Sequence, residues 1–153
     1  ALLVFWPMAT LFTKIIEGEI PGRFVWRDER SVAFLTIAPI APGHTLVVPI
    51  DEVDHWLDLE PDLAAHLTEV ARQVGLAQMR AFSPRRVGLI VAGLEVPHFH
   101  IHVLPIDAEA DLSFARADHS PDPARLDAAA EALRGALRDL GHDSVVAPGG
   151  ASG

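Results

Sequence analysis

The stretch that constrains this chain most is His98-Phe99-His100-Ile101-His102-Val103-Leu104-Pro105. Successive side chains of a β-strand point to opposite faces, so the three histidines would share one face while Phe99, Ile101 and Val103 face the core. Pro105 has no backbone N–H to donate, and we therefore expect the strand to end there. Three imidazoles on one face suit phosphate chemistry, proton transfer or metal binding.

Two other interpretations of these histidines stay open. Alternating histidines can bind zinc or iron, although a closed site needs a fourth ligand. The acids that flank the strand, Glu95 and Asp107, do not have clear ligand spacing. The histidines can also be three unrelated surface residues on an edge strand. We expect no metal and no other cofactor.

Composition narrows the classes of partner. The sequence has a formal net charge of −9, a single lysine (Lys14) and no cysteine. Nucleic-acid binding needs a basic surface and is therefore disfavoured, whereas backbone amides and histidines can hold a small phosphorylated ligand. Without cysteine the sequence has no disulfide, catalytic thiol or cysteine-ligated zinc, which fits a cytoplasmic protein.

The 153 residues suit one domain with its own core, which we place at residues 8–141. Residues 1–7 are apolar but too short to span a bilayer, so we expect either an upstream extension or a docking segment, and no membrane partner. Residues 142–153 are rich in Gly, Ala and Ser and are expected to be a disordered tail.

Apolar periodicity and turn residues predict five strands and three helices. We expect the strands at residues 24–28, 31–37, 45–49, 86–92 and 98–105. A short helix is expected over 10–18, and two longer amphipathic helices are expected over 61–82 and 123–140. His44 follows a Pro-Gly turn, where its side chain has either a direct catalytic role or a hydrogen bond to a loop carbonyl.

This arrangement resembles the histidine-triad (HIT) superfamily over residues 8 to 141. The most specific match is residues 98–104, which follow the family pattern His-φ-His-φ-His-φ-φ, where φ is apolar. Residues 42–49 and residues 12–21 support it. The resemblance implies an α+β fold with a five-stranded antiparallel sheet and two main helices, the sheet being extended across a homodimer.

The resemblance also implies a function. Members hydrolyse or transfer nucleotidyl groups, acting on the α-phosphate of nucleoside phosphoramidates or dinucleoside polyphosphates through a covalent nucleotidyl-histidine. His100 corresponds to the nucleophile, and His98 and His102 to residues that hydrogen-bond the phosphate oxygens. A neutral imidazole is an available nucleophile at pH 7 because its reference pKa is about 6.5. The purine nucleotide pocket maps onto four apolar residues and one ribose-contacting hydroxyl: Phe12, Ile15, Phe34, Ile37 and Thr36.

Several positions depart from the family pattern. Thr36 stands where many relatives have an aspartate for the ribose, and Leu94 where a glutamine often lies. Thr10 and Thr13 replace cysteines that give some relatives a structural zinc.

The acid–base position departs as well. Glu52 replaces the family's upstream histidine, so Glu52, His55 or Glu95 is a possible acid or base for the leaving group. These changes keep open a nucleotide-binding or sensing protein without useful turnover, beside the less favoured metalloenzyme.

We expect a homodimer for two reasons besides the resemblance. A five-stranded sheet leaves edge strands that proteins usually pair or cover. The long helix also carries small residues (Ala71, Ala77 and Ala81) that permit close packing against a neighbour.

Overall fold

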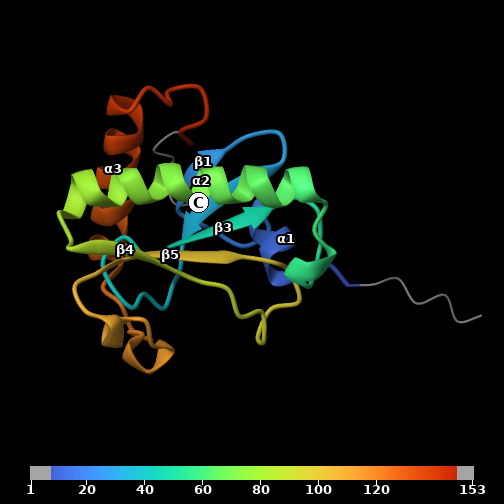
Figure 1. Cartoon of the computed structure of the whole chain (residues 1–153), viewed down its shortest axis with the longest axis horizontal. Helices are drawn as coiled ribbons and strands as arrows, with labels where there is room; N and C mark the ends of the chain where they lie inside the picture. Colours follow the sequence, from blue (N-terminus) through green and yellow to red (C-terminus); the bar gives the residue numbers. More distant parts are fainter. Residues whose placement is uncertain (1–7, 148–153) are drawn as a thin grey trace, which may run out of the picture.

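The computed structural model describes residues 8–147, so residues 1–7 and the last six residues of the expected tail lie outside it. Its two long helices are α2 (Pro61–Phe82) and α3 (Pro123–Asp139). The other elements are, in chain order, α1 (Leu11–Ile16), β1 (Phe24–Arg27), β2 (Ser31–Leu35), β3 (Thr45–Pro49), η1 (Trp56–Asp58), β4 (Arg86–Ile90), β5 (Ile101–Ile106), η2 (Glu109–Asp111) and η3 (Phe114–Arg116), where η marks a 3-10 helix (Figure 1).

The strands form one antiparallel sheet in the order β1-β2-β3-β5-β4. Figure 1 shows α2 running across the sheet, and α3 contacts both α2 and β1. The predicted α+β fold, a five-stranded antiparallel sheet with two main helices, is confirmed. Among the described residues, no helix combines the length and the apolar character that crossing a membrane requires.

Both faces of the central strands are covered, and the side chains of β2 and β3 are all buried. Alternate residues serve different layers, as a pleated strand requires. Ala33 and Val47 pack with α2 and α3 in the larger core, whereas Phe34 and Leu46 pack with α1 in a smaller cluster on the opposite face.

The strand of the histidine motif begins later than predicted. β5 starts at Ile101, so His98 and His100 precede it. Leu46 pairs with His102 and Val47 with Ile101, and the same register would bring Pro49 opposite Phe99. Proline has no N–H for that ladder, which explains why strand pairing stops before the first two histidines.

The other end of β5 also differs from the prediction. Pro105 lies inside the strand, opposite Val87 of β4, and the strand continues to Ile106. The pairing of β3 with β5 reaches only Val103, so Pro105 lies beyond the last pair on that side. A proline is tolerated where a strand has lost one of its neighbours.

Part of the expected disordered tail is packed on the sheet. Gly141 ends α3 with a φ of 94°, as expected of a helix terminator, and the chain turns back toward β1. There the N–H of Arg27 donates to the carbonyl of Val145 at 2.8 Å, and Val146 is buried in the larger core. Residues 142–147 therefore cover the outer edge of β1, contrary to our expectation for this stretch.

The small residues of the long helix do not face a neighbour. Ala71 and Ala77 are 2% and 0% exposed and belong to the larger core, and Ala81 packs against it. They let α2 approach its own sheet closely, so they give no argument for a dimer.

Candidate active site

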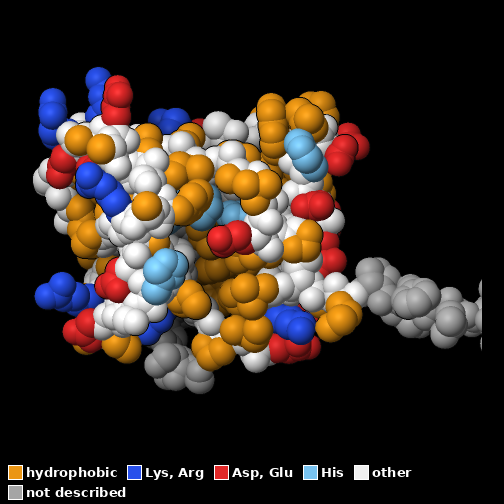
Figure 2. All heavy atoms as spheres, turned by 90° about the horizontal axis from the view of Figure 1, so that it is seen from below, with side chains coloured by type: hydrophobic (Ala, Val, Ile, Leu, Met, Phe, Trp, Pro, Cys, Tyr) orange, Lys and Arg blue, Asp and Glu red, His pale blue; other side chains and the backbone are white. Residues whose placement is uncertain are grey.

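The three histidines of the motif lie together on the sheet face opposite α2. His98 is fully buried and His100 is 7% exposed, and the His100 and His102 ring centroids are 4.9 Å apart. Phe99 and Ile101 lie in the core behind them, which confirms the predicted division of the two faces. Figure 2 shows histidine side chains in a hollow surrounded by hydrophobic side chains.

Both ring nitrogens of His98 are used inside the protein. Nε2 lies 2.7 Å from the carbonyl oxygen of Pro49, which can only accept, so Nε2 carries the proton. Nδ1 then accepts from the hydroxyl of Thr10 at 2.7 Å. Burial lowers the pKa of His98, in keeping with this neutral form. His98 is therefore an anchor between α1 and β3, and the expected bond from its side chain to a phosphate oxygen has no free donor.

His100 has one nitrogen engaged and one free. Nδ1 lies 2.8 Å from the carbonyl oxygen of His98 and must donate to it, so the neutral ring has a lone pair on Nε2. Burial lowers the pKa of His100, which keeps that lone pair available at neutral pH. This nitrogen is therefore available to accept a proton or to attack an electrophilic atom.

His102 receives a hydrogen bond from His44, a partner that we did not assign to it from the sequence. The backbone N–H of Ile40 donates to Nδ1 of His44 at 3.0 Å, so the proton of neutral His44 is on Nε2. That N–H donates to Nδ1 of His102 at 2.9 Å, which leaves His102 with a free N–H at Nε2. The loop partner of His44 is thus a backbone N–H and not the carbonyl that was considered from the sequence, and the other ring nitrogen of His44 fixes the tautomer of His102.

Both members of this pair resist protonation. Burial lowers the pKa of His44 to about 4. Burial, together with the positive charges that His44 and His100 would carry, lowers the pKa of His102 to about 3. At neutral pH His102 offers a hydrogen-bond donor without a positive charge.

Helix α2 holds this pair from the far side of the sheet. The buried amide of Gln78 donates to the carbonyls of Gly43 and Val103, both at 2.9 Å. Gly43 has a φ of 84°, and a Cβ there would overlap an aromatic ring at the end of α2. Since Gly43 precedes His44 and Val103 follows His102, these contacts tie together the two strands that carry the pair.

An apolar wall lies beside His100, where the nucleotide pocket was expected. Phe12, Ile15 and Phe34 are buried in one cluster, and the Phe12 ring lies 4.9 Å from that of His100 and 5.6 Å from that of Phe34. The structure therefore brings three of the five predicted pocket residues together with the histidines.

The other two predicted pocket residues lie in the turn after β2. The Thr36 hydroxyl accepts from the N–H of Ala38 at 3.1 Å, and the Thr36 N–H donates to the carbonyl of His44. Ile37 is 74% exposed and does not belong to the apolar cluster. Thr36 thus adjoins the histidine pair through the backbone, whereas Ile37 does not join the wall.

The acid–base candidates differ in where they lie. Glu52 accepts from the N–H of Thr10 at 2.9 Å and from the hydroxyl of Thr13 at 2.6 Å, and these bonds lower its pKa. It therefore anchors α1 as a carboxylate. His55 caps η1 by accepting from Leu57, so it too has a local structural partner. The charge of Glu95 raises the pKa of His100 against the effect of burial, which places this carboxylate within electrostatic reach of His100.

A second aromatic ring, Phe114 of η3, also lies at the site and was missed from the sequence. Its centroid is 4.9 Å from that of His102 in an edge-to-face arrangement, and its side chain remains 46% exposed. Phe114 lies in an acidic, turn-rich segment without apolar periodicity, so no sequence signal pointed to it.

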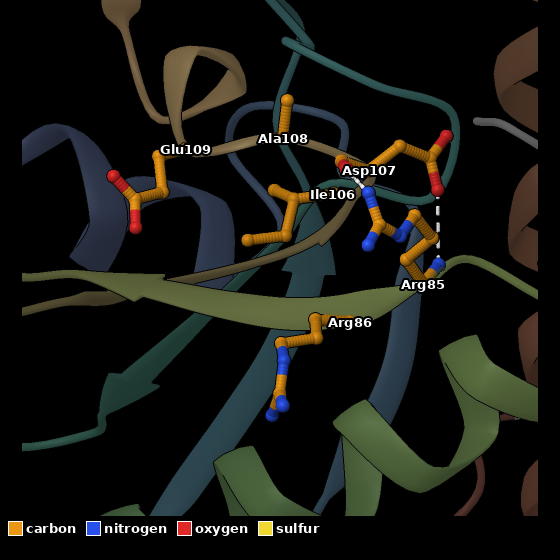
Figure 3. Close-up of a pocket in the computed structure, with 6 residues that line it drawn as sticks. All are labelled: Arg85, Arg86, Ile106, Asp107, Ala108 and Glu109. Atoms are coloured by element: carbon orange, nitrogen blue, oxygen red, sulfur yellow. Dashed lines mark hydrogen bonds between the residues drawn. The ribbon is translucent and has the colours of Figure 1, made fainter.

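A surface pocket of about 450 Å³ lies at the other end of β5 and contains none of the histidines. Figure 3 shows its lining, in which Arg85 donates to Asp107. Arg86 pairs with Ile106, and His102 lies four residues away along β5, about 13 Å at strand spacing. This pocket is separate from the histidine site.

With the geometry in place, the comparison with known proteins is decisive about the family. The sequence model of the HIT domain matches residues 17–109, which is more than half of the chain. The chain belongs to the HIT family.

Known relatives of this HIT protein cover most of its length. An uncharacterized HIT-like protein of Saccharolobus solfataricus is 34% identical over 100 residues, 62% of this chain and 72% of the relative. A histidine triad nucleotide-binding protein of Sulfolobus tokodaii, described as hypothetical, superposes with a TM-score of 0.76 at 26% identity, covering 86% of this chain and 96% of the relative. A zinc-bound histidine triad protein of Mycobacterium smegmatis has the same TM-score at 27% identity, covering 88% and 96%.

The residues of this chain do not fit a zinc site of the kind that the cysteines form in some relatives. The resemblance sets Thr10 and Thr13 against those cysteines, and zinc prefers sulfur, imidazole and carboxylate ligands to hydroxyls. The hydroxyl of Thr10 bonds to His98, and that of Thr13 bonds to Glu52, so hydrogen bonds join the groups directly. Among residues 8–147, no group of three or more His, Cys, Asp or Glu is arranged to hold a metal.

From the lowered pKa values of His44 and His102 we predict that the free energy of unfolding depends on pH. In the unfolded chain His44 and His102 take up protons near pH 6.5, whereas in the folded protein they stay neutral down to about pH 4 and about 3. The unfolded state binds more protons in between, so the free energy of unfolding should fall as the pH is lowered from 6.5 toward 4, by ~1.4 kcal/mol per pH unit for each group. Urea unfolding at several pH values measures this slope.

The variant His44→Asn removes one of the two groups and serves as the comparison. Its stability should depend less steeply on pH, by about the contribution of one imidazole. An equal slope in both proteins over this range would contradict the assignment.

Proposed function

We propose that this HIT protein is a nucleotide hydrolase or nucleotidyltransferase. Its substrate would be a nucleoside phosphoramidate or a dinucleoside polyphosphate, with attack at the α-phosphate. The observation that carries the proposal is the free Nε2 lone pair of His100, whose Nδ1–H is held by the carbonyl of His98. The printed name of the Sulfolobus tokodaii relative, a nucleotide-binding protein, supports a nucleotide as the ligand.

The reaction would run in two displacements. Nε2 of His100 forms a bond to the α-phosphorus as the bond to the leaving group breaks, and the leaving group departs with that electron pair and takes one proton from solvent or a nearby acid. Water, or another acceptor in a transfer, then attacks the nucleotidyl-histidine. The lone pair returns to His100 and the acceptor releases one proton.

The two other histidines of the motif would have different roles. The free N–H of His102 is placed to donate to a phosphoryl oxygen, where negative charge gathers in the transition state. His98 would act through its backbone carbonyl, which aims His100, and through a side chain that holds α1 and β3 in place. His44 would keep the donor hydrogen of His102 on Nε2.

The nucleoside would lie against the apolar wall of Phe12, Ile15 and Phe34, with a purine ring contacting the edge-on phenyl of Phe12. Thr36 has a hydroxyl hydrogen left for a ribose oxygen, since its oxygen already accepts from Ala38. We infer a cytoplasmic protein because the sequence lacks cysteine.

A binding or sensing protein with little turnover is the second candidate, and a specific observation favours it. Glu52 and His55 are engaged in local hydrogen bonds, which leaves Glu95 as the candidate acid for the leaving group. A site without a positioned acid would bind nucleotides and cleave poor leaving groups slowly.

Replacing the nucleophile separates these candidates. His100→Ala should lower the hydrolysis of adenosine 5′-phosphoramidate by more than tenfold, because it removes the covalent route while the apolar wall remains. Rapid quenching of the wild type, followed by mass spectrometry, should find a nucleotidyl group on the peptide that contains His100.

The control for this experiment is His119→Ala, which removes an exposed imidazole outside the motif. It should retain wild-type turnover. If His100→Ala keeps more than a tenth of the activity, the assigned nucleophile is wrong, and a wild type that binds AMP without turning over any phosphoramidate would favour the sensing function.

We also propose that the protein is a homodimer joined at the free edge of β4. Residues 142–147 cover the β1 edge, whereas β4 carries exposed Leu89 and is followed by exposed Val91. Leu76 and Met79 of the neighbouring α2 are each 41% exposed. Pairing two β4 edges would extend the sheet and bury these side chains together.

Light scattering at micromolar concentration should therefore give twice the mass of one chain. Leu89→Arg should shift the protein to the monomer, because it buries a charge in the proposed interface. The matched control is Leu57→Arg, at an exposed leucine of η1, and it should leave the dimer intact. A wild-type monomer, or a dimer unaffected by Leu89→Arg, would contradict this interface.

A further inference from the structure

A row of four aromatic rings crosses the histidine site. The centroids of Phe12 and His100, of His100 and His102, and of His102 and Phe114 are each 4.9 Å apart, all in edge-to-face contact. The two ends differ, because Phe12 is 4% exposed and sealed into the apolar wall, whereas Phe114 is 46% exposed. The Phe114 end therefore presents an open aromatic surface beside the free N–H of His102.

The segment that carries Phe114 is held by its own hydrogen bonds. The carboxylate of Asp111 accepts from the N–H groups of Asp107 and Ala108 at 2.9 and 3.0 Å. The same carboxylate pairs with Arg116 at 2.7 Å. Farther along, the N–H of Asp118 donates to the carbonyl of Pro39 at 2.9 Å, which ties the segment to the loop before His44.

Packing against the sheet also fixes the position of the segment that carries Phe114. Leu112 packs directly over Gly88 of β4, where a Cβ would approach its side chain to 2.6 Å. A side chain at residue 88 would therefore require the end of the Leu112 side chain to move. The turn that places Phe114 against His102 is therefore held by its own hydrogen bonds and packing, although the Phe114 ring adds little to the core.

The titratable side chains at the Phe114 end of the site are either uncharged or already in an ion pair. The guanidinium of Arg116, on the same 3-10 helix as Phe114, is engaged by Asp111. The lowered pKa values of His44 and His102 keep both rings uncharged at neutral pH. A polyphosphate chain, which carries several negative charges, would gain no ion pair from these groups.

We propose that Phe114 and His102 form a subsite for the leaving group and that this group is an arylalkyl amine, which carries no charge while its nitrogen is bonded to phosphorus. The inference rests on the proposed function and narrows its substrate to aryl-substituted nucleoside phosphoramidates. With the nucleoside against Phe12 at one end of the row, the group that departs from phosphorus extends toward the other end. An aryl ring there would pack against the exposed face of Phe114 while the His102 N–H holds a phosphoryl oxygen.

A substrate panel with matched variants tests this subsite. The substrates are adenosine 5′-phosphoramidate itself, its N-propyl derivative, its N-(2-arylethyl) derivative and diadenosine tetraphosphate. Wild type should prefer the arylethyl compound in kcat/KM. Phe114→Ala should lower kcat/KM for that compound by about 3- to 10-fold, and for the unsubstituted one by less than twofold.

Two further variants control for shape and folding. Phe114→Leu keeps an apolar side chain and should lose most of the aryl preference, while thermal unfolding reports whether either variant is destabilised. Trp56→Ala removes an exposed aromatic ring from η1 and should change no substrate's rate. An equal loss on all substrates would make Phe114 a support for His102 only, and a wild-type preference for diadenosine tetraphosphate would overturn the subsite.

A binding measurement separates failure of the subsite from failure of the proposed function. In the His100→Ala background, calorimetry should give tighter binding of the arylethyl compound than of the unsubstituted one, and Phe114→Ala should abolish the difference. This preference without wild-type turnover would retain the subsite and reject the hydrolase. No preference in either protein would reject the subsite, whatever the turnover.

Discussion

The hydrogen bond from Nδ1 of His100 to the carbonyl of His98 is the contact on which the rest of the site depends. Burial keeps this imidazole neutral, and the bond holds its proton on Nδ1 and leaves the lone pair on Nε2. The carbonyl belongs to a peptide that precedes β5, beyond the point where the pairing of β3 with β5 stops. The orientation of His100 is thus set by a stretch of backbone that lies outside the strand ladder.

The other buried imidazoles are also neutral, and hydrogen-bond partners also fix their tautomers. Four histidines lie within one small region, and four positive charges there would be costly in a low dielectric. Instead each ring is neutral and each engaged nitrogen has a partner of fixed polarity, from Ile40 to His44 to His102 and from Thr10 to His98 to Pro49. Within residues 8–147, Nε2 of His100 and Nε2 of His102 are the ring nitrogens of this group without a partner, one an acceptor and one a donor. This difference is what gives two adjacent, chemically identical side chains different roles.

Much of the fold followed from local pattern. Alternation in residues 98–104 separated the core face from the histidine face correctly, and apolar periodicity located α2 and α3. Local pattern did not indicate where strand pairing would stop, because that depends on the register between β3 and β5. It also missed the packing of Val145 and Val146 on β1, since three-dimensional proximity and not composition decides whether a short apolar tail is ordered.

The site was less predictable than the fold for the same reason. The motif named three histidines, but the partner that sets the tautomer of His102 lies 58 positions earlier, and the ring of Phe114 comes from an irregular turn. Glu52 was a reasonable acid from its position in the chain, yet its bonds to Thr10 and Thr13 make it an anchor for α1. Residue identity indicated the chemistry, whereas the hydrogen-bond partner of each nitrogen determined the role.

The central claim, that backbone and side-chain partners fix the tautomer of each buried imidazole, can be measured directly by nitrogen-15 NMR. Long-range proton–nitrogen correlation spectra at pH 7 distinguish protonated from bare ring nitrogens in each histidine. The account predicts a proton on Nδ1 and a bare Nε2 for His100, and the reverse for His44, His98 and His102. A His100 ring that is doubly protonated, or that carries its proton on Nε2, would contradict it.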